Sequence, residues 1–376
     1  MLHAVPAGIL SFPSGGYVPA GGLYLDGSSD YLSWTPSGVA SSNTDKTISF
    51  WVKRAKFGSV QWILDVSSNG DQIQYTVGDK LEVSLNATTD SHYTTKAVYR
   101  DPAAWTNIII AFDTDSGTAA NKKRLWINGV LQEDAVLDNH DDPADDANVD
   151  WMKQSIAHNI GRRGNNSQFF EGYLADFIGI DGALDADSFG EYDSDTGIWV
   201  PKDPSGLTFG NNGFHLDFAD SSDLGNDVSG NNNDFTANSI AAANYVNDNC
   251  VNDADNNKGN HATQNPLLFN GTLSEGNLKV TADTSGYINS TIGTVAASSG
   301  KFYHEIDLIS SIDSTNTFGV LNTDDPAAMI MDQLSSHYVG HANGGGWAYK
   351  PGSTPKKWTN STQEHYGVNV TDGDTL

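Results

Sequence analysis

The stretch Arg124-Leu-Trp-Ile-Asn-Gly-Val-Leu-Gln132 decides the class of fold, because it predicts a β-hairpin. Asn128 and Gly129 can supply the two positive-φ residues of a type I′ turn, and apolar residues flank the pair on both sides. An isolated hairpin is marginally stable at best, so further strands must lie beside it. The sequence supplies candidates for these strands on both sides of the hairpin.

Apolar residues alternate with a period of two in Thr47-Ile-Ser-Phe-Trp-Val-Lys53 and again in Ile108-Ile-Ile-Ala-Phe112. The second stretch is apolar on both faces, which predicts a strand covered on both sides. Gly172-Tyr-Leu-Ala-Asp-Phe-Ile-Gly-Ile180 supplies a further strand. Since no sustained 3.6-residue apolar stripe occurs between residues 21 and 182, this segment is predicted to be all β.

The composition favours the same class. The 376 residues include 38 Gly, and of the 47 acidic residues only seven are Glu. Glu favours helix interiors, whereas Asp, Asn, Gly and Ser favour turns and caps. This composition is therefore typical of short strands joined by many polar turns. At roughly 100–200 residues per domain, the length predicts two or three domains.

The charge balance excludes several classes of partner. Only 20 Lys and Arg stand against 47 Asp and Glu, which gives a formal net charge of -27. Such a field repels a phosphate backbone or an anionic membrane surface, so we expect no sequence-independent binding of nucleic acid. We also expect no membrane insertion, because the longest apolar run is far shorter than the ~20 residues of a membrane helix. The N-terminal residues lack the pattern of a secretory signal.

The strand motifs follow one another in an order that resembles a known family. The motifs are Tyr24-Leu-Asp-Gly-Ser-Ser-Asp-Tyr-Leu-Ser33, Ile48-Ser-Phe-Trp-Val52, Trp105, Trp126-Ile-Asn-Gly-Val130 and Phe170-Glu-Gly-Tyr-Leu-Ala-Asp176. Together they resemble the laminin-G-like branch of the concanavalin A-like lectin/glucanase jelly rolls. The resemblance implies a β-sandwich over residues 21–182.

The rest of the chain changes character twice. Residues 183–262 are rich in Asn, Asp, Ser and Gly and poor in apolar periodicity, so we interpret them as a connector that holds a few strands. Further on, Ser299-Gly-Lys-Phe-Tyr-His-Glu-Ile306 and Gly346-Trp-Ala-Tyr349 resemble strands of the SPRY β-sandwich. That family has more strands after the one that Asp372-Gly-Asp-Thr-Leu376 resembles. Either the sequence is a fragment, which we favour, or another subunit completes the sheet.

The predicted architecture is an all-β chain with two β-sandwich (jelly-roll) domains in tandem. Its parts are an extended N-terminal arm (1–20), a laminin-G-like sandwich (21–182), an Asn/Asp/Gly-rich connector (183–262) and a SPRY-like sandwich (263–376). Cys250 is the single cysteine, so neither an intramolecular disulfide nor a cysteine metal cluster is possible.

Signals for catalysis are weak. The chain has no Gly-x-Ser-x-Gly nucleophile turn and no phosphate-binding Gly-rich loop. Glu305 and Asp307 fit the Glu-x-Asp-x-x-Glu strand of jelly-roll glucanases, but Ser310 replaces the second glutamate. Without a general acid the leaving group cannot be protonated, which forfeits about 10²–10⁴-fold in rate. We therefore predict a non-enzymatic protein, with a glycoside hydrolase as the disfavoured alternative.

Aromatic and basic residues are the candidate ligand contacts. Sugars stack their apolar faces on Trp and Tyr, while Asp, Asn and Arg bond to the hydroxyls. The predicted glycan contacts are Trp62, Tyr93, Tyr99, Trp105, Trp151 and Arg162. The alternative for each aromatic residue is packing in the core, as expected for Trp51 within a strand.

Calcium is the candidate metal, because hard cations take six to eight oxygen ligands and turns rich in Asp and Asn provide them. The predicted ligands lie in the acidic stretch 217–234 and are Asp217 and, flanking a glycine turn, Asp227, Asn231, Asn233 and Asp234. A second acidic stretch, residues 134–150, carries seven Asp but no Gly. For both stretches a solvated acidic loop without a metal is the open alternative.

Taken together, these features favour display over catalysis. A laminin-G-like module, an Asn/Asp-rich connector and a SPRY-like module in tandem look like virion structural proteins of tailed bacteriophages. The resemblance implies a fibre, appendage or decoration protein that is made in the host cytoplasm, located in the virion and attached to a host-surface glycan. We expect docking on other virion proteins through residues 1–20 and a homo-oligomer, with a trimer favoured. The alternative is a calcium-dependent lectin not tied to a virion.

Overall fold

The computed structural model describes residues 16–66, 70–85, 92–253, 256–269, 271–281, 291–296, 304–310, 317–321, 346–351, 354–359 and 362–376. The chain divides into two compact units, and the boundary falls between His261 and Ala262. All regular elements of the described residues are β-strands or short 3₁₀ turns, so the all-β fold class is confirmed. Among these residues there is no helix long and apolar enough to span a membrane.

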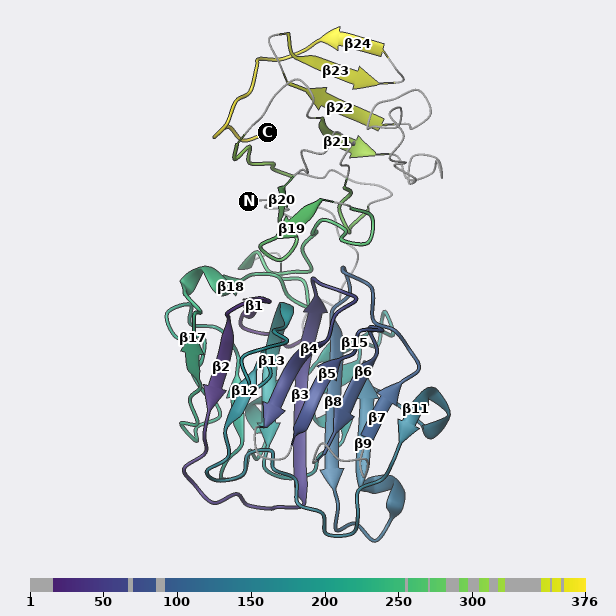
Figure 1. Ribbon diagram of the computed structural model, residues 1–376, viewed down its shortest axis with the longest axis vertical. Helices are drawn as coiled ribbons and strands as arrows, with labels where there is room; N and C mark the ends of the chain where they lie inside the picture. The colour runs from purple at the N-terminus through teal and green to yellow at the C-terminus, as the bar shows by residue number, and fades with distance from the viewer. Residues whose placement is uncertain are drawn as a thin grey trace. The chain divides into compact units, whose positions relative to one another are not determined.

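The first unit is built on two antiparallel sheets of eight strands each (Figure 1). Sheet A has the order β10-β9-β8-β3-β13-β1-β18, and β16 also pairs with β13. Its strands are β1 (Gly22–Asp26), β3 (Asp45–Arg54), β8 (Thr106–Asp113), β9 (Lys123–Ile127), β10 (Val130–Leu131), β13 (Glu171–Ile180), β16 (Phe214–Leu216) and β18 (Tyr245–Val246).

Sheet B has the order β11-β7-β6-β5-β4-β12-β2-β17. Its strands are β2 (Tyr31–Trp34), β4 (Gln61–Val66), β5 (Asp71–Tyr75), β6 (Leu81–Ser84), β7 (His92–Thr95), β11 (Leu137–His140), β12 (His158–Ile160) and β17 (Thr236–Asn238). The 3₁₀ turns are η1 (Ala119–Asn121), η2 (Asp134–Val136), η3 (Ala186–Ser188), η4 (Pro204–Gly206) and η5 (Ala242–Asn244).

The predicted hairpin is present as β9 and β10. Ile127 pairs with Val130 across the turn, and Asn128 and Gly129 have φ angles of 48° and 76°. Both angles lie in the left-handed region, as a type I′ turn requires. The register of this edge of sheet A is therefore fixed by two adjacent residues.

The main core lies between the two sheets, where the inward faces of their strands meet. The rings of Phe50 and Phe177 stack with centroids 5.0 Å apart, and Phe112 contacts Trp151 edge to face at 5.0 Å. Full burial of one such side chain contributes about 1.5–3 kcal/mol. This core accounts for the alternation seen in the sequence, since every second residue of β3 and β8 points into it.

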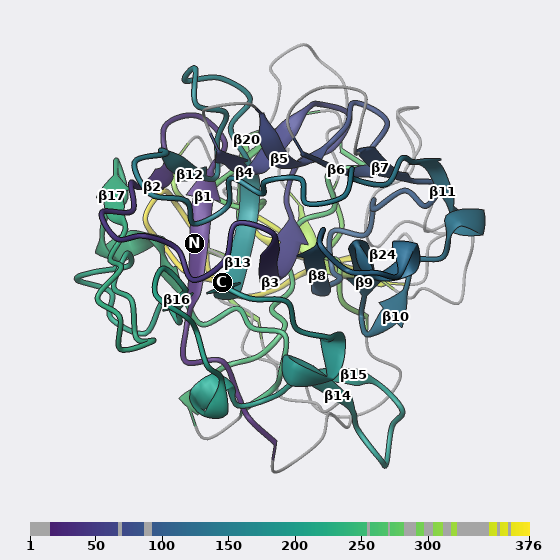
Figure 2. The same cartoon turned by 90° about the horizontal axis from the view of Figure 1, so that it is seen from below.

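A third layer covers the outer face of sheet A. Parts of residues 183–261, among them the hairpin of β14 (Gly190–Tyr192) and β15 (Trp199–Pro201), fold back over this face (Figure 2). They bury a second apolar cluster that contains Trp51, Tyr173 and Trp199. Beneath this layer, Lys53 Nζ forms a buried ion pair with Asp248 at 2.8 Å.

Residues 183–262, which we interpret as a connector that holds a few strands, also contribute to both sheets of the sandwich. Strands β16, β17 and β18 lie within this segment, and they extend sheet A and sheet B of the sandwich. Each of them has only two or three residues, which is too short for an alternation signal.

The described end of the predicted arm is also held against the sandwich. Tyr17 Oη donates to Asp176 Oδ1 at 3.0 Å, and Asn249 Nδ2 donates to Pro19 O at 2.9 Å. Residues 1–15 of the predicted arm lie outside the described residues.

The second unit contains a hairpin and a separate antiparallel sheet within its described residues. The strands are β19 (Thr272–Ser274) and β20 (Lys279–Thr281) in the hairpin, and β21 (Phe318–Leu321), β22 (Gly346–Lys350), β23 (Lys356–Thr359) and β24 (Thr362–His365), in that order, in the sheet. Among the described residues of this unit, the apolar side chains of Leu308 and Ala348 are buried.

Candidate functional site

A row of polar side chains crosses the outer face of sheet B. One residue from each of seven neighbouring strands lies in direct cross-strand register with the next: Thr236, Ser33, Asn159, Asp65, Gln72, Ser84 and His92. Directly paired residues share a face, and their neighbours Leu32, Ile160 and Ile73 point into the core. The third layer covers the outer face of sheet A, so this row, in which β17 contributes Thr236, lies on the sandwich face that the layer leaves uncovered.

Glu82 is the centre of a hydrogen-bond network beside this row. Its carboxylate accepts from Gln72 Nε2 at 3.1 Å, from Gln74 Nε2 and from His92 Nε2 at 3.1 Å. Burial acts to raise the pKa of Glu82, but the hydrogen bonds from His92 and Gln74 outweigh it and hold the pKa below that of an exposed glutamate. Glu82 therefore stays ionised at neutral pH and fixes the side chains around it.

Three polar atoms next to this network are buried without a hydrogen-bond partner among the described residues. They are Trp62 Nε1, Gln74 Oε1 and Ser84 Oγ. Trp62 and Gln74 are direct cross-strand partners, and the Arg163 guanidinium lies 5.0 Å from the Trp62 ring centroid. An unmet buried donor or acceptor costs about 1–3 kcal/mol. A hydroxylated ligand that reached these atoms would relieve that cost.

Arg162 is fixed at the edge of the same face. Its Nη2 donates to Asn159 Oδ1 at 3.1 Å, its Nη1 donates to Asn166 Oδ1, and its guanidinium lies 3.4 Å from the ring centroid of Tyr31. The supporting loop is tied to the sheet because the backbone N–H of Gly164 donates to Asp65 Oδ2 at 2.5 Å. A guanidinium held in this way loses little rotamer entropy when it binds a ligand hydroxyl or carboxylate.

Two of the six predicted glycan contacts, Trp62 and Arg162, belong to this face, where Arg162 is half-buried and Trp62 is buried at 5% exposed. Trp151 is fully buried between the sheets, and the buried Tyr93 donates its hydroxyl to a backbone carbonyl in the core at 3.0 Å. Trp105 is 9% exposed and donates Nε1 to a buried aspartate. The alternative given for each aromatic residue, packing in the interior, therefore describes Tyr93, Trp105 and Trp151.

Tyr99 packs against the core, half-buried, with its ring centroid 6.0 Å from that of Tyr75. Glu82, Gln74 and Ser84 escape prediction from the sequence, because polar residues in a strand are ordinary on any solvated face. The polar–apolar alternation of residues 71–75 is the signal that could have placed such residues together on one face.

The predicted calcium ligands form a turn held by hydrogen bonds of the chain itself. Asp227 accepts from the backbone N–H groups of His215 and Asn233, both at 2.8 Å. The side-chain amides of Asn231 and Asn233 each donate to Gly213 O at 2.9 Å. The remaining two accept backbone N–H groups, Asp217 from Ala219 and Asp234 from Asp227. All five side chains thus have structural partners, as in the metal-free alternative.

One group of three carboxylates converges in the described part of the chain, formed by Asp45, Asp113 and Asp115. Burial, with the nearby charge of Asp115, raises the pKa of Asp45 and of Asp113. These oxygens are close enough to share one cation. Three of the seven aspartates of residues 134–150 instead form separate ion pairs, Asp138 with Lys80, Asp145 with Lys122 and Asp150 with Lys153.

Residues 26–188 match the family model of the concanavalin A-like lectin/glucanases superfamily. The matched segment begins at the end of β1 and ends at η3, so it contains most of both sheets of the first unit. The first unit is therefore a lectin-like jelly roll, as the order of the strand motifs predicted. No curated protein matches the chain.

Solved structures similar to the chain include three with low sequence identity. A heptameric SAP-like pentraxin from Limulus polyphemus is 12% identical, with 45% of this chain and 80% of that chain covered and a TM-score of 0.34. A putative carbohydrate binding protein from Bacteroides ovatus is 14% identical, with 58% of each chain covered and a TM-score of 0.35. The CBM40 of Ruminococcus gnavus IT-sialidase, bound to α2,3-sialyllactose, is 14% identical, with 46% and 96% covered and a TM-score of 0.31.

Proposed function

We propose that this protein binds carbohydrate without cleaving it, and that it does so as a structural component of a tailed-bacteriophage virion. The outer face of sheet B carries the first part of the proposal. It combines the anchored Arg162, an ionised Glu82 and the buried unmet atoms of Trp62, Gln74 and Ser84. Sugar hydroxyls both donate and accept hydrogen bonds, so they suit a face that offers free donors and acceptors together.

The position of the glucanase-like motif supports binding over hydrolysis. Glu305 and Asp307 lie in the second unit, outside the segment that matches the lectin/glucanase family. Asp307 Oδ1 accepts from Thr375 Oγ1 at 2.7 Å, in a bridge between two segments of that unit. The one motif that could suggest catalysis is therefore separated from the jelly roll in which such a strand would act.

The virion role rests on the tandem arrangement of units and on charge. The second unit is proposed to be SPRY-like, and a net charge of -27 keeps a displayed protein soluble at high local density. Residues 1–15 are proposed to dock on other virion proteins, and the residues that follow them, Tyr17 and Pro19, are hydrogen-bonded to the sandwich. Multivalent display on a homo-oligomer, with a trimer favoured, would strengthen weak glycan contacts.

Binding can be tested on a glycan array with the full chain, with calcium and with a chelator. Arg162→Ala is expected to weaken binding about tenfold or more, since a hydrogen bond to a charged group contributes roughly 1.5–3 kcal/mol. Ser84→Ala is expected to weaken binding several-fold while raising stability by about 1 kcal/mol, because it removes an unmet hydroxyl. Lys279→Ala, which removes a cation of the second unit, is the control and should change neither property.

Three outcomes would contradict parts of the proposal. Binding that is unchanged in Arg162→Ala and Ser84→Ala would exclude the outer face of sheet B as the site. Release of reducing ends from laminarin or agarose, lost in Glu305→Gln, would establish an enzyme. Mass spectrometry that finds the protein in soluble lysate and never in purified particles would exclude the virion role, and binding abolished by chelator would then favour a free calcium-dependent lectin.

A further inference from the structure

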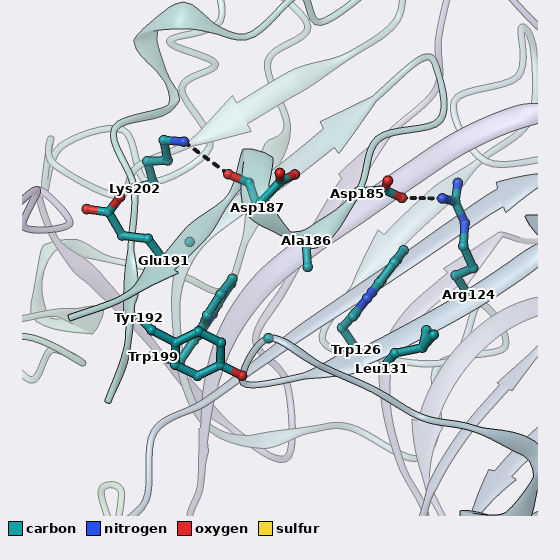
Figure 3. A pocket seen from close by; sticks show the side chains of 12 residues that line it. Arg124, Trp126, Leu131, Asp185, Ala186, Asp187, Glu191, Tyr192, Trp199 and Lys202 are labelled. Atoms are coloured by element: carbon teal, nitrogen blue, oxygen red, sulfur yellow. Dashed lines mark hydrogen bonds and ion pairs between the residues drawn. The ribbon is translucent and has the colours of Figure 1, made fainter. Parts of the chain in front are cut away.

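A pocket of about 690 Å³ (Figure 3) is lined by Trp126 and Trp199, which belong to the apolar cluster on the outer face of sheet A, the opposite side of the sandwich from sheet B. It lies between the β9–β10 hairpin and residues 185–202 of the third layer. Its volume falls in the range of about 300–1,000 Å³ that is usual for small-ligand sites. Because residues 189–202 lie outside the family-matched segment, this pocket is a feature that the jelly roll alone does not provide.

The floor of the pocket is rigid. Trp199 packs so closely on Gly129 and Gly190 that a Cβ at either glycine would lie 2.3–2.4 Å from its ring. Its Nε1 donates to Asn107 Oδ1 at 2.9 Å, and the Tyr192 ring meets it edge to face at 5.0 Å. Trp199 is thus buried at 8% exposed and supports the exposed ring of Tyr192, which is in place before any ligand binds, and this lowers the entropic cost of binding.

The rim of the pocket carries both signs of charge. Arg124 pairs with Asp185 through Nη1, while its buried Nε has no hydrogen-bond partner among the described residues. Lys202 Nζ donates to the backbone carbonyl of Asp187 at 3.1 Å, and the exposed Glu191 lies beside this lysine (Figure 3). Donors and acceptors thus surround the aromatic floor on both sides.

This combination selects one chemical class of ligand. An anion would meet the carboxylates of Asp185, Asp187 and Glu191, and a cation would meet Arg124 and Lys202. A purely apolar ligand would strip water from all five charged groups without replacing their hydrogen bonds. An uncharged sugar avoids these costs, since its apolar face stacks on the exposed ring of Tyr192 and its hydroxyls bond to both kinds of rim group.

We propose that this pocket is a second glycan site, specific for an uncharged sugar and independent of the outer face of sheet B. It shares no residue with that face and stands on its own geometry. A protein with one site on each side of the sandwich can bridge two glycan chains or bind one polymer at two points.

The test titrates the full-length protein with maltotriose, cellotriose, laminaritriose and xylotriose, and with sialyllactose as the charged comparison. Binding is followed by saturation-transfer NMR and tryptophan fluorescence. Tyr192→Ala is expected to weaken binding of at least one neutral trisaccharide about tenfold. Tyr192 is 53% exposed, so this change should not unfold the protein; Tyr366→Ala removes a 57% exposed tyrosine of the second unit as the matched control.

A second variant, Glu191→Gln, keeps the shape of the rim and removes one acceptor charge, and it is expected to weaken the same ligand several-fold. Neutral-sugar binding that is lost in Arg162→Ala and intact in both pocket variants would overturn the second site and support the sheet B site. If neutral-sugar binding is lost in the pocket variants and kept in Arg162→Ala, the result supports the second site, whether or not the outer face of sheet B also binds a glycan. Failure of the wild-type protein to bind any neutral trisaccharide, or a preference for sialyllactose at this pocket, would overturn the inference.

Discussion

His158 couples the core of the sandwich to pH. The side chain is 2% exposed, and its Nε2 accepts the backbone N–H of Met152 at 2.6 Å. The proton of the neutral ring must therefore lie on Nδ1, which donates to Ile156 O at 2.9 Å. Burial lowers the pKa of His158 from 6.5 to about 4, because a charged imidazolium would lose its hydration and face a donor.

This arrangement predicts a loss of stability in mild acid. Between pH 6.5 and about 4 the unfolded chain binds a proton at His158 that the native chain does not, so the free energy of unfolding decreases as pH falls. The decrease is expected to reach about 3 kcal/mol at pH 4. Urea unfolding of the wild type and of His158→Gln at pH 7 and pH 4 measures it. The variant should lose about 3 kcal/mol less than the wild type; equal losses would show that His158 does not carry this pH dependence.

At the scale of elements, the β9–β10 hairpin serves two purposes. Asn128 and Gly129 set the register of the sheet A edge, and Gly129 also forms one wall against Trp199. No residue with a Cβ can occupy this turn position and still pack against Trp199, since its Cβ would lie 2.3 Å from the indole ring. The Asn128-Gly129 turn, which has the clearest turn signal in the sequence, is thus also part of the pocket.

Gly129→Ala is expected to destabilise the protein by about 2–4 kcal/mol. The left-handed φ costs roughly 1–2 kcal/mol, and displacement of Trp199 from its packing adds the rest. Gly58→Ala is the matched control, because Gly58 has a φ of 68° and open space where the Cβ would lie. Chemical denaturation compares the two, and equal losses would show that the contact with Trp199 contributes nothing.

At the scale of the whole molecule, the third layer is part of the folding unit. It covers Trp51 and Tyr173 on sheet A and supplies Asp248 as the partner of the buried Lys53. It also adds β16 and β18 to sheet A and β17 to sheet B. The segment that matches the family model therefore leaves a large apolar face uncovered when taken alone.

Two truncations test this dependence. A chain that ends at Ser188 retains the family-matched segment, yet it is expected to aggregate or to unfold without cooperativity, because each exposed large apolar side chain forfeits about 1.5–3 kcal/mol. A chain that ends at His261 should keep its near-ultraviolet circular dichroism and a single thermal transition. Similar cooperative melting of both chains would show that the third layer is dispensable.

The parts of the fold that could be predicted are those written in local patterns. The alternation in residues 47–53 and 108–112 predicted β3 and β8, and the Asn-Gly pair predicted the β9–β10 turn. A few strands were predicted within residues 183–262, but the bounds and sheet partners of β16 to β18 could not be predicted, because two or three residues carry no measurable period. Of the candidate site, Trp62 and Arg162 were predicted, whereas Glu82 and its neighbours lacked any signal stronger than alternation.

Local sterics and side-chain period act within a few residues, so the amino-acid sequence alone settled the all-β class, the main strands and the tightest turn. It could not settle what each aromatic residue packs against, because alternation assigns a residue to a face without saying what covers that face. Trp62 and Trp151 look alike in the sequence and both are buried, yet Trp62 lies beside Arg163 on the outer face of sheet B and Trp151 lies between the sheets. The pocket of Arg124 and Trp199 exists only because the third layer folds back on sheet A, and that packing arises from long-range burial of apolar surface.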